Sequence, residues 1–166
     1  LVVDKIWLEL NAQGSNDKVF YTIFNKASLI NANLTGANLM GVRFVAAKLS
    51  DANFSEATLY KGNLSRANLS RANLTKASLY GTNLSKTILR EAILIDANFK
   101  RANLTEADLS EAILSEADLW QANLTNANLT GANLNSANLE ETILKDANLS
   151  ETDLTNVRYF ETALKC

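Results

Sequence analysis

The chain of 166 residues contains no histidine and only one cysteine. Histidine is the side chain that most often acts as a general base or a metal ligand near neutral pH, so its absence removes the usual basis for both. The one cysteine, Cys166, is the last residue and cannot form a disulfide within the chain. We expect an exposed thiol without a special role, with a disulfide between two chains as the alternative.

Segments that bind phosphate or zinc, or that cross a membrane, are missing too. The sequence has no glycine-rich phosphate loop, no Cys/His spacing of a zinc site and no run of about 18 apolar residues. Carboxylates occur in pairs, such as Glu106 with Asp108, but we expect them on a convex, solvated surface where burial does not raise the pKa of a carboxyl group. The sequence therefore predicts that the protein is not an enzyme and has no catalytic residue, cofactor or metal site.

The chain does contain a five-residue repeat, which runs from Thr22 to Leu164 without insertion or deletion. The repeat reads Ala-Asn-Leu-x-x, as in Ala67-Asn68-Leu69. Its central position occurs 29 times, with Leu in 24 repeats and Phe or Tyr in the other five. The position two residues earlier, which we call the small position, is Ala in 20 of the 29 repeats. Such regularity indicates one structural unit over most of the chain.

A period of five fits neither regular secondary structure. On an α-helix each successive Leu would be rotated by about 140°, and on a flat strand successive Leu residues would point to opposite faces. The chain must therefore turn once in every repeat, and four turns of about 90° close one coil of about 20 residues. The Leu and Ala side chains then point inward and the residue between them points outward.

The backbone of such a coil can form hydrogen bonds only with the coils before and after it. We therefore expect parallel ladders, with about 4.8 Å between neighbouring coils. The span from position 24 to position 164 predicts an all-β solenoid: a four-sided parallel β-helix of about seven coils.

The repeated Ala-(Asn/Asp)-Leu-x-x pattern resembles that of the pentapeptide-repeat family, and the resemblance extends from Thr22 to Leu164. It implies a right-handed quadrilateral β-helix; the handedness comes from the resemblance and not from the period. It also implies that the last coil is often closed by a helix or a dimer contact. Some members of the family look like duplex DNA and bind DNA gyrase and other type II topoisomerases.

The two ends of the chain depart from the simple repeat. Four apolar residues have the spacing of an amphipathic helix, which we expect over residues 2–12 as a cap on the first coil: Val3, Ile6, Trp7 and Leu10. Residues 1–21 would then be cap and loop, and residues 22–166 the β-helix; a membrane or partner anchor is the alternative use of this helix. Residues 157–166 fit either a last coil or a helix, and a homodimer through Tyr159 and Phe160 at the C-terminal end is a third option.

Residues 20 apart should stack in columns on the outer surface. One column reads Met40, Tyr60, Tyr80, Lys100, Trp120, Glu140 and Phe160. Large exposed apolar groups often mark contact surfaces, so the sequence predicts a protein-binding face made of Met40, Tyr60, Tyr80, Trp120 and Phe160. Stacking that only stabilises the ladder is the alternative. A smaller outward group extends this face or raises strand propensity: Ile88, Ile93, Ile95 and Ile113.

Charge is unevenly distributed along the chain. Residues 1–90 contain 11 basic and 5 acidic residues, whereas residues 91–166 contain 5 basic and 13 acidic residues. Halves of opposite net charge suit antiparallel or head-to-tail association. The simpler interpretation is that these charges only keep the protein soluble.

Together these features predict a non-catalytic, rigid scaffold that binds an unidentified protein partner. A structural protein that forms oligomers is the alternative. A DNA mimic is less favoured, because the net charge is only −2 and one half is basic. We expect no nucleic acid partner, since aromatic and basic residues are not interleaved in the predicted columns. The sequence begins with Leu1 and so reveals no targeting segment; we favour the cytoplasm of a bacterium, with the thylakoid lumen or the periplasm as alternatives.

Overall fold

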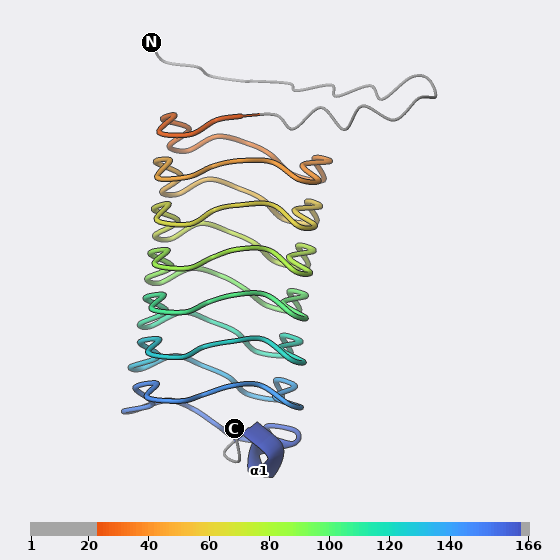
Figure 1. Cartoon of the computed structure of the whole chain (residues 1–166), viewed down its shortest axis with the longest axis vertical. Coiled ribbons are helices and arrows are strands. Elements are labelled where there is room, and N and C mark those ends of the chain that lie inside the picture. The colour runs from red at the N-terminus through yellow and green to blue at the C-terminus, as the bar shows by residue number, and fades with distance from the viewer. Residues whose placement is uncertain (1–22, 164–166) are drawn as a thin grey trace.

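The chain winds into a four-sided rod of stacked coils (Figure 1), in which the order along the axis is the order of the sequence. The structure, a computed structural model, describes residues 23–163. Isolated parallel bridges join each outward residue to the residue 20 positions later, from Ile23 with Arg43 to Asn138 with Arg158. Each of the four sides thereby contains a column of seven bridged residues. The interval of 20 and the seven coils expected from the sequence are confirmed.

Every side of a coil ends in a tight turn. The amide of the small residue donates to the carbonyl of the central residue three positions earlier, as Ala32 does to Leu29 at 3.1 Å. The two residues between the bonded pair are the first and second turn positions, and the second has a positive φ at all 27 positions from 26 to 156, of which only four are glycine. A left-handed conformation costs an L-residue about 1–2 kcal/mol. The turns are therefore strained one by one and must be stabilised by the packing and the ladders around them.

All five amides of the repeat that begins at Ala52 find acceptors. The Ala52 amide closes the turn at 3.2 Å, and the Asn53 amide donates to the coil before it at 2.9 Å. The amides of Phe54 and Glu56 donate to the coil after it at 2.7 and 2.9 Å. The Ser55 amide, which reaches neither coil, donates to the side-chain Oδ1 of Asn53 at 2.9 Å. The Asn of the consensus is thus a hydrogen-bond acceptor for its own turn.

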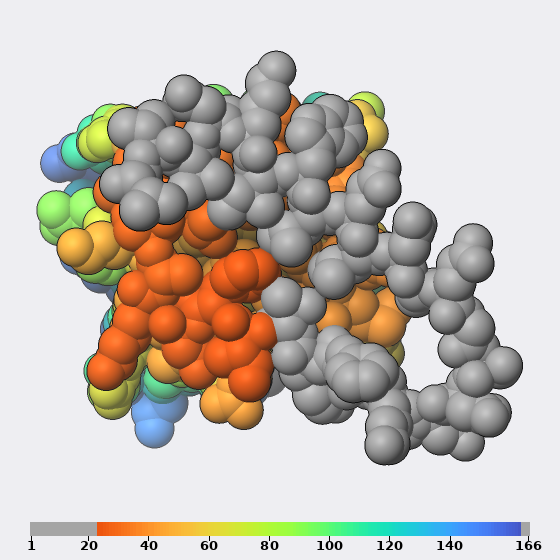
Figure 2. All heavy atoms as spheres, turned by 90° about the horizontal axis from the view of Figure 1, so that it is seen from above, coloured from red at the N-terminus to blue at the C-terminus, as the bar shows by residue number. Residues whose placement is uncertain are grey.

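The central and small side chains fill the inside of the rod as one continuous core. Most central residues from Leu39 to Leu139 are inaccessible to solvent, including Phe44, Phe54 and Phe99. Seen from the N-terminal end (Figure 2), the later coils lie behind the first described coil. Burying each Leu contributes about 1.5–3 kcal/mol.

Threonines at the small position are buried without leaving a hydroxyl group unpaired, because their hydroxyls donate to main-chain carbonyls of the preceding coil. Thr82 Oγ1, for example, lies 2.8 Å from the carbonyl oxygen of Leu59. Thr87 and Thr142 repeat this bond, at 2.9 and 2.7 Å. The small position therefore tolerates a hydroxyl group as well as a methyl group.

At the C-terminal end the chain leaves the coil. Tyr159 stands at a central position in the sequence, but it has a φ of 62° and is 57% exposed. Helix α1, Phe160–Ala163, follows it, with Phe160 packed against the core and Ala163 buried. Residues 160–163 thus form a short helix and not a last coil. The expected N-terminal helix with Val3, Ile6, Trp7 and Leu10 lies outside the described residues and stays a prediction. Within residues 23–163, no helix has the length and apolar character needed to span a membrane.

Gly62 provides a test of how tightly the small positions stack. A methyl group built on Gly62 would lie 3.3 Å from a methyl carbon of Val42, the residue 20 positions earlier, and 3.0 Å from the carbonyl oxygen of Leu59. We expect Gly62→Ala to lower the free energy of unfolding by about 1–3 kcal/mol, as overpacking does. The double variant Val42→Ala with Gly62→Ala should recover most of that loss in urea denaturation, because Ala over Ala is the usual arrangement. A double variant no more stable than Gly62→Ala would contradict this explanation.

The role of the consensus Asn can be tested at Asn103, whose Oδ1 accepts from the Thr105 amide at 3.0 Å and from the Thr105 hydroxyl at 2.7 Å. Asn103→Ala removes this acceptor and should lower the free energy of unfolding by about 1 kcal/mol. Asn103→Asp keeps an acceptor oxygen in the same place, as the natural Asp153 does for Thr155. We expect its midpoint in urea to stay close to that of the unchanged protein, and equal losses in the two variants would show that the acceptor is not what matters.

Candidate interaction surface

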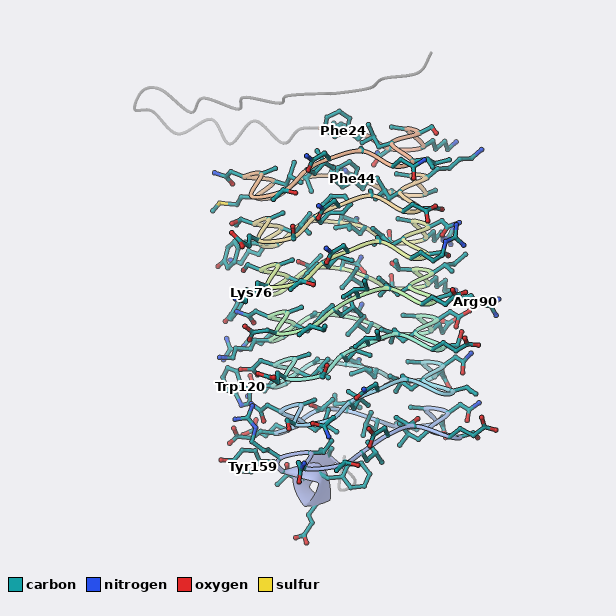
Figure 3. The ribbon with its side chains drawn as sticks, turned by 180° about the vertical axis from the view of Figure 1, so that it is seen from behind. Phe24, Phe44, Lys76, Arg90, Trp120 and Tyr159 are labelled. Atoms are coloured by element: carbon teal, nitrogen blue, oxygen red, sulfur yellow. The ribbon has the colours of Figure 1, made fainter. Side chains whose placement is uncertain are left out.

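The first position of each turn is at least partly exposed, and one corner of the rod carries large side chains there. We call it the aromatic corner. Its first turn positions are Met40, Tyr60, Tyr80, Lys100, Trp120 and Glu140. Met40 is 55% exposed, and the other five are half-buried. Figure 3 shows Trp120 pointing outward from the rod, away from Arg90 on the opposite side.

Two tyrosines of this corner lie directly against each other. The ring centroids of Tyr60 and Tyr80 are 5.5 Å apart, with 22° between the ring planes. This geometry follows from the coil spacing of about 4.8 Å, which brings equivalent side chains of neighbouring coils into stacking distance. Stacking therefore does stabilise part of the column.

Basic side chains cover the aromatic rings. Lys61 Nζ lies 5.1 Å from the ring centroid of Tyr60, and the guanidinium carbon of Arg101 lies 4.9 Å from that of Trp120. Arg101 is held in place by a hydrogen bond from Nε to Gln121 Oε1 at 2.9 Å. Aromatic and basic groups are thus interleaved at this corner, and the expectation that they would not be was wrong. The reason is that Lys and Arg at the second turn position extend along the axis over the ring of the same or the next coil.

The N-terminal two thirds of the aromatic corner is positively charged. Between residues 38 and 103, the corner and the outward columns on its two sides contain four basic residues and no acidic one: Arg43, Lys61, Lys100 and Arg101. Asp118 is the first carboxylate in this region, and it pairs with Lys100 at 3.0 Å. Sequence reasoning missed the contribution of Lys61 and Arg101. Both could have been found from the sequence. Lys61 directly follows Tyr60, and Arg101 directly follows Lys100, which stands 20 residues before Trp120 in the same column.

Two parts of the predicted face lie elsewhere. Phe160 begins helix α1 and packs against the core, so it does not continue the column of Met40, Tyr60, Tyr80 and Trp120. The exposed isoleucines Ile88 and Ile113 lie on two sides of the rod that do not border the aromatic corner. They therefore do not extend it.

Ion pairs on the other sides also join neighbouring coils. Arg71 contacts Asp51 at 2.8 Å, and Arg90 contacts Asp108 at 2.6 Å. The hydrogen bond and charge of Asp51 raise the pKa of the Arg71 guanidinium. Partial burial acts to raise the pKa of Asp108, but hydrogen bonds from Ser110 and Arg90 outweigh it and hold that pKa below its ordinary value. The Asp108 carboxylate is therefore stabilised as an anion and is unsuited to act as a general acid.

A shallow hollow of about 300 Å³ lies between Arg90, Glu91, Ser110, Glu111, Asn128 and Thr130. In the part of the chain that the structure describes, no three carboxylate or thiol side chains are grouped closely enough to hold a metal ion. The aromatic corner remains the best candidate for a functional surface.

Several solved structures of other proteins are similar to this chain. Rfr23 from the cyanobacterium Cyanothece 51142 is 44% identical over 60% of this chain and 61% of its own, with a TM-score of 0.36. HetL, a protein of Nostoc sp. strain PCC 7120 involved in heterocyst differentiation regulation, is 28% identical over 82% of this chain and 78% of its own, with a TM-score of 0.29. QnrB1, a plasmid-mediated fluoroquinolone resistance protein, is 20% identical over 90% and 91%, with a TM-score of 0.49.

The chain thus spans about three fifths of the length of Rfr23. Among curated proteins, no match was found. The family model described as pentapeptide repeats matches residues 22–59, 52–90, 89–121 and 122–158. These stretches include nearly all of the coils described above. Proteins of this family form right-handed quadrilateral β-helices and are generally non-catalytic, and this chain belongs to the pentapeptide-repeat family.

Proposed function

We propose that this protein is a non-catalytic scaffold that binds another protein along its aromatic corner. The observation that carries the proposal is the line of Met40, Tyr60, Tyr80 and Trp120, interleaved with Lys61 and Arg101. Aromatic and arginine side chains are the groups most enriched at energetically important positions of protein interfaces. The generally non-catalytic character of the family agrees with a binding role.

The fold makes this surface rigid before any partner arrives. Each coil is hydrogen-bonded to the coil before it and to the coil after it, so the backbone under the aromatic corner cannot rearrange locally. The rings of Tyr60 and Trp120 are further held by the cations that cover them. A preorganised surface loses little conformational entropy on binding, which favours affinity.

The charge of the corner indicates which partner it fits. Four basic residues without a carboxylate between residues 38 and 103 favour a partner segment that carries acidic and apolar side chains. Lys61 and Arg101 would contact the carboxylates, and the rings beside them would contact the apolar groups. Glycine at positions 41 and 81 leaves Met40 and Tyr80 without a covering side chain in their own turns.

Stacking alone does not account for the whole column. Tyr60 and Tyr80 do stabilise each other. Met40, however, is 55% exposed, and Lys100 stands between Tyr80 and Trp120 in the column. A column selected only for stacking would have no reason to interrupt the aromatic run with a cation, so we favour binding.

Single-stranded nucleic acid is the second candidate, because interleaved aromatic and basic groups also suit stacked bases and phosphates. Against it stand the net charge of −2 and the acidic C-terminal half. A mimic of duplex DNA is favoured less, since duplex DNA is negative along its whole length and the N-terminal half of this rod is basic.

The experiment is a comparison of binding partners between the unchanged protein and the triple variant Tyr60→Ser, Tyr80→Ser and Trp120→Ser. Proteins captured only by the unchanged chain would then be purified and titrated. We expect the triple variant to bind at least about 30-fold more weakly, since loss of a hot spot costs about 2 kcal/mol or more. A matched variant, Ile93→Ser, Ile95→Ser and Ile113→Ser, removes outward apolar groups from other parts of the rod and should bind normally.

Circular dichroism of both variants would confirm that the coil is intact. If both triple variants captured and bound every partner as well as the unchanged chain, the aromatic corner would have no role in binding. A parallel titration with a fluorescent oligothymidylate would separate the candidates. Binding of the oligonucleotide that is lost in the aromatic variant, without a protein partner, would favour nucleic acid instead.

A further inference from the structure

A different side of the rod carries a charge pattern that fits a second copy of the same chain. We call it the Ile88 side. Its outward column is Ser28, Lys48, Asn68, Ile88, Asp108, Asn128 and Asn148. Two corners of the rod border it, and their first turns are at residues 25–26 and 30–31. The aromatic corner is neither of these, so the Ile88 side is a separate surface.

Charge on the Ile88 side is divided equally into two halves. Its first four rungs, the segments 25–31, 45–51, 65–71 and 85–91, contain six basic and two acidic residues. The last three rungs, the segments 105–111, 125–131 and 145–151, contain one basic and five acidic residues. The net charges are therefore +4 over the first four rungs, of which the fourth contributes +1, and −4 over the last three. Counted in the same way, none of the other three sides is equal and opposite.

Ion pairs within the chain do not use up this pattern. Three pairs join rungs of the Ile88 side: Arg71 with Asp51 at 2.8 Å, Lys86 with Glu106 at 3.3 Å, and Arg90 with Asp108 at 2.6 Å. Among the residues described, eight others make no ion pair: Lys26, Lys48, Arg66 and Glu91 in the first half, and Glu111, Lys145, Asp146 and Glu151 in the second. Of these eight, Glu91 and Lys145 have the sign opposite to that of their half.

We propose that two copies of this chain associate side by side and antiparallel through their Ile88 sides. The two-fold axis lies in the interface, perpendicular to the rods, and passes through the fourth rung. It places rung one opposite rung seven and rung three opposite rung five. Lys26 then faces Asp146 of the second copy, and Arg66 faces Glu106 of the second copy. On the other corner, Arg71 faces Glu111 of the second copy. Because the interface is symmetric, each of these pairs occurs twice.

The charges also fix the register of the two copies. A shift by one coil in one direction would bring Asp51 opposite Glu151, and a shift in the other direction would bring Arg66 opposite Lys86. Like charges in contact across an interface are unfavourable. The arrangement centred on the fourth rung avoids both of these contacts, and its like-charged neighbours are confined to the axis, where residues of the fourth rung meet their own copies.

The shape of the surface agrees with this register. The hollow of about 300 Å³ lies between Glu91 on the fourth rung, Glu111 on the fifth and Asn128 on the sixth. In the proposed pair, Arg71 of the second copy, which Asp51 of its own chain also contacts, stands opposite Glu111 at this hollow. A long basic side chain thus meets a concave site that contains two carboxylates and Arg90.

On the axis itself, identical residues of the two copies meet. Ile88 is 39% exposed and would pack against Ile88 of the second copy, which provides an apolar centre. Lys86, Arg90 and Glu91 flank it and also meet their own copies. Lys86 and Arg90 are already paired within their own chain, with Glu106 at 3.3 Å and with Asp108 at 2.6 Å, whereas Glu91 makes no ion pair within the described residues.

The first test measures mass in solution as a function of salt, by sedimentation or light scattering. The unchanged chain should have twice its 18.1 kDa mass at low salt and move towards the monomer in about 0.5 M salt, where exposed pairs are screened. Lys26→Glu and Asp146→Lys should each weaken association about tenfold or more. The double variant should restore it, because the pair is re-formed with reversed signs.

Matched controls come from another corner of the rod. Lys76→Glu and Glu116→Lys make the same charge changes at exposed positions that do not border the Ile88 side, and both should leave association unchanged. A monomer at all salt concentrations would overturn the proposal. It would also be overturned if the control variants dissociated as much as Lys26→Glu and Asp146→Lys. A dimer that is indifferent to Lys26→Glu and Asp146→Lys would also overturn it, because it would use another surface.

The second test locates the axis by disulfide formation. In a Cys166→Ser background, Ile88→Cys should form a disulfide with the same residue of the second copy under mild oxidation at low salt. Ile113→Cys is the control, since Ile113 is 38% exposed but lies on a different side. Equal cross-linking of the two variants, or none at position 88 in a sample that is dimeric by mass, would contradict the proposed register. Neither test depends on the aromatic corner, which stays exposed in the pair.

Discussion

The structure depends on hydrogen bonds that a single coil cannot make. In the repeats of the inner coils three of five amides donate to a neighbouring coil, one closes the turn, and one is satisfied by the consensus Asn when that residue is present. The turns themselves hold non-glycine residues at positive φ, which is unfavourable for each residue alone. A coil therefore gains stability only when another coil lies on it, and a buried line of Leu, Phe and Ala side chains forms as the coils stack.

The same interval of 20 residues determines the outer surface. It brings Tyr60 onto Tyr80, Arg101 onto Trp120 and Lys86 onto Glu106, although these residues are far apart in the sequence. Two surfaces result, the aromatic corner and the Ile88 side, and they do not overlap. A pair of chains joined through the Ile88 side would present two aromatic corners that run in opposite directions. The two proposals are therefore compatible, and each can fail without the other.

Much of this fold could be predicted from the sequence, because a period of five leaves one way to bury every Leu and pair every amide. The coil length, the inward positions and the column of Met40, Tyr60, Tyr80 and Trp120 all follow from it. The cations over the rings could not be read from a column, since Lys61 and Arg101 stand at the next turn position and reach the rings only through their long side chains. Phe160 was misplaced because the repeat in the sequence continues to Leu164, whereas the chain leaves the coil at Tyr159.

The unbroken repeat also limits how such a protein can change in length. Inserting one five-residue unit would move every later residue to the next side of the rod, which would split the aromatic corner and misalign the small positions at which Val42 lies over Gly62. Inserting 20 residues would add one coil and keep every later residue on its side. Gains and losses of whole coils are thus the changes that preserve the pattern of both surfaces, and a chain of this kind should vary in steps of four repeats.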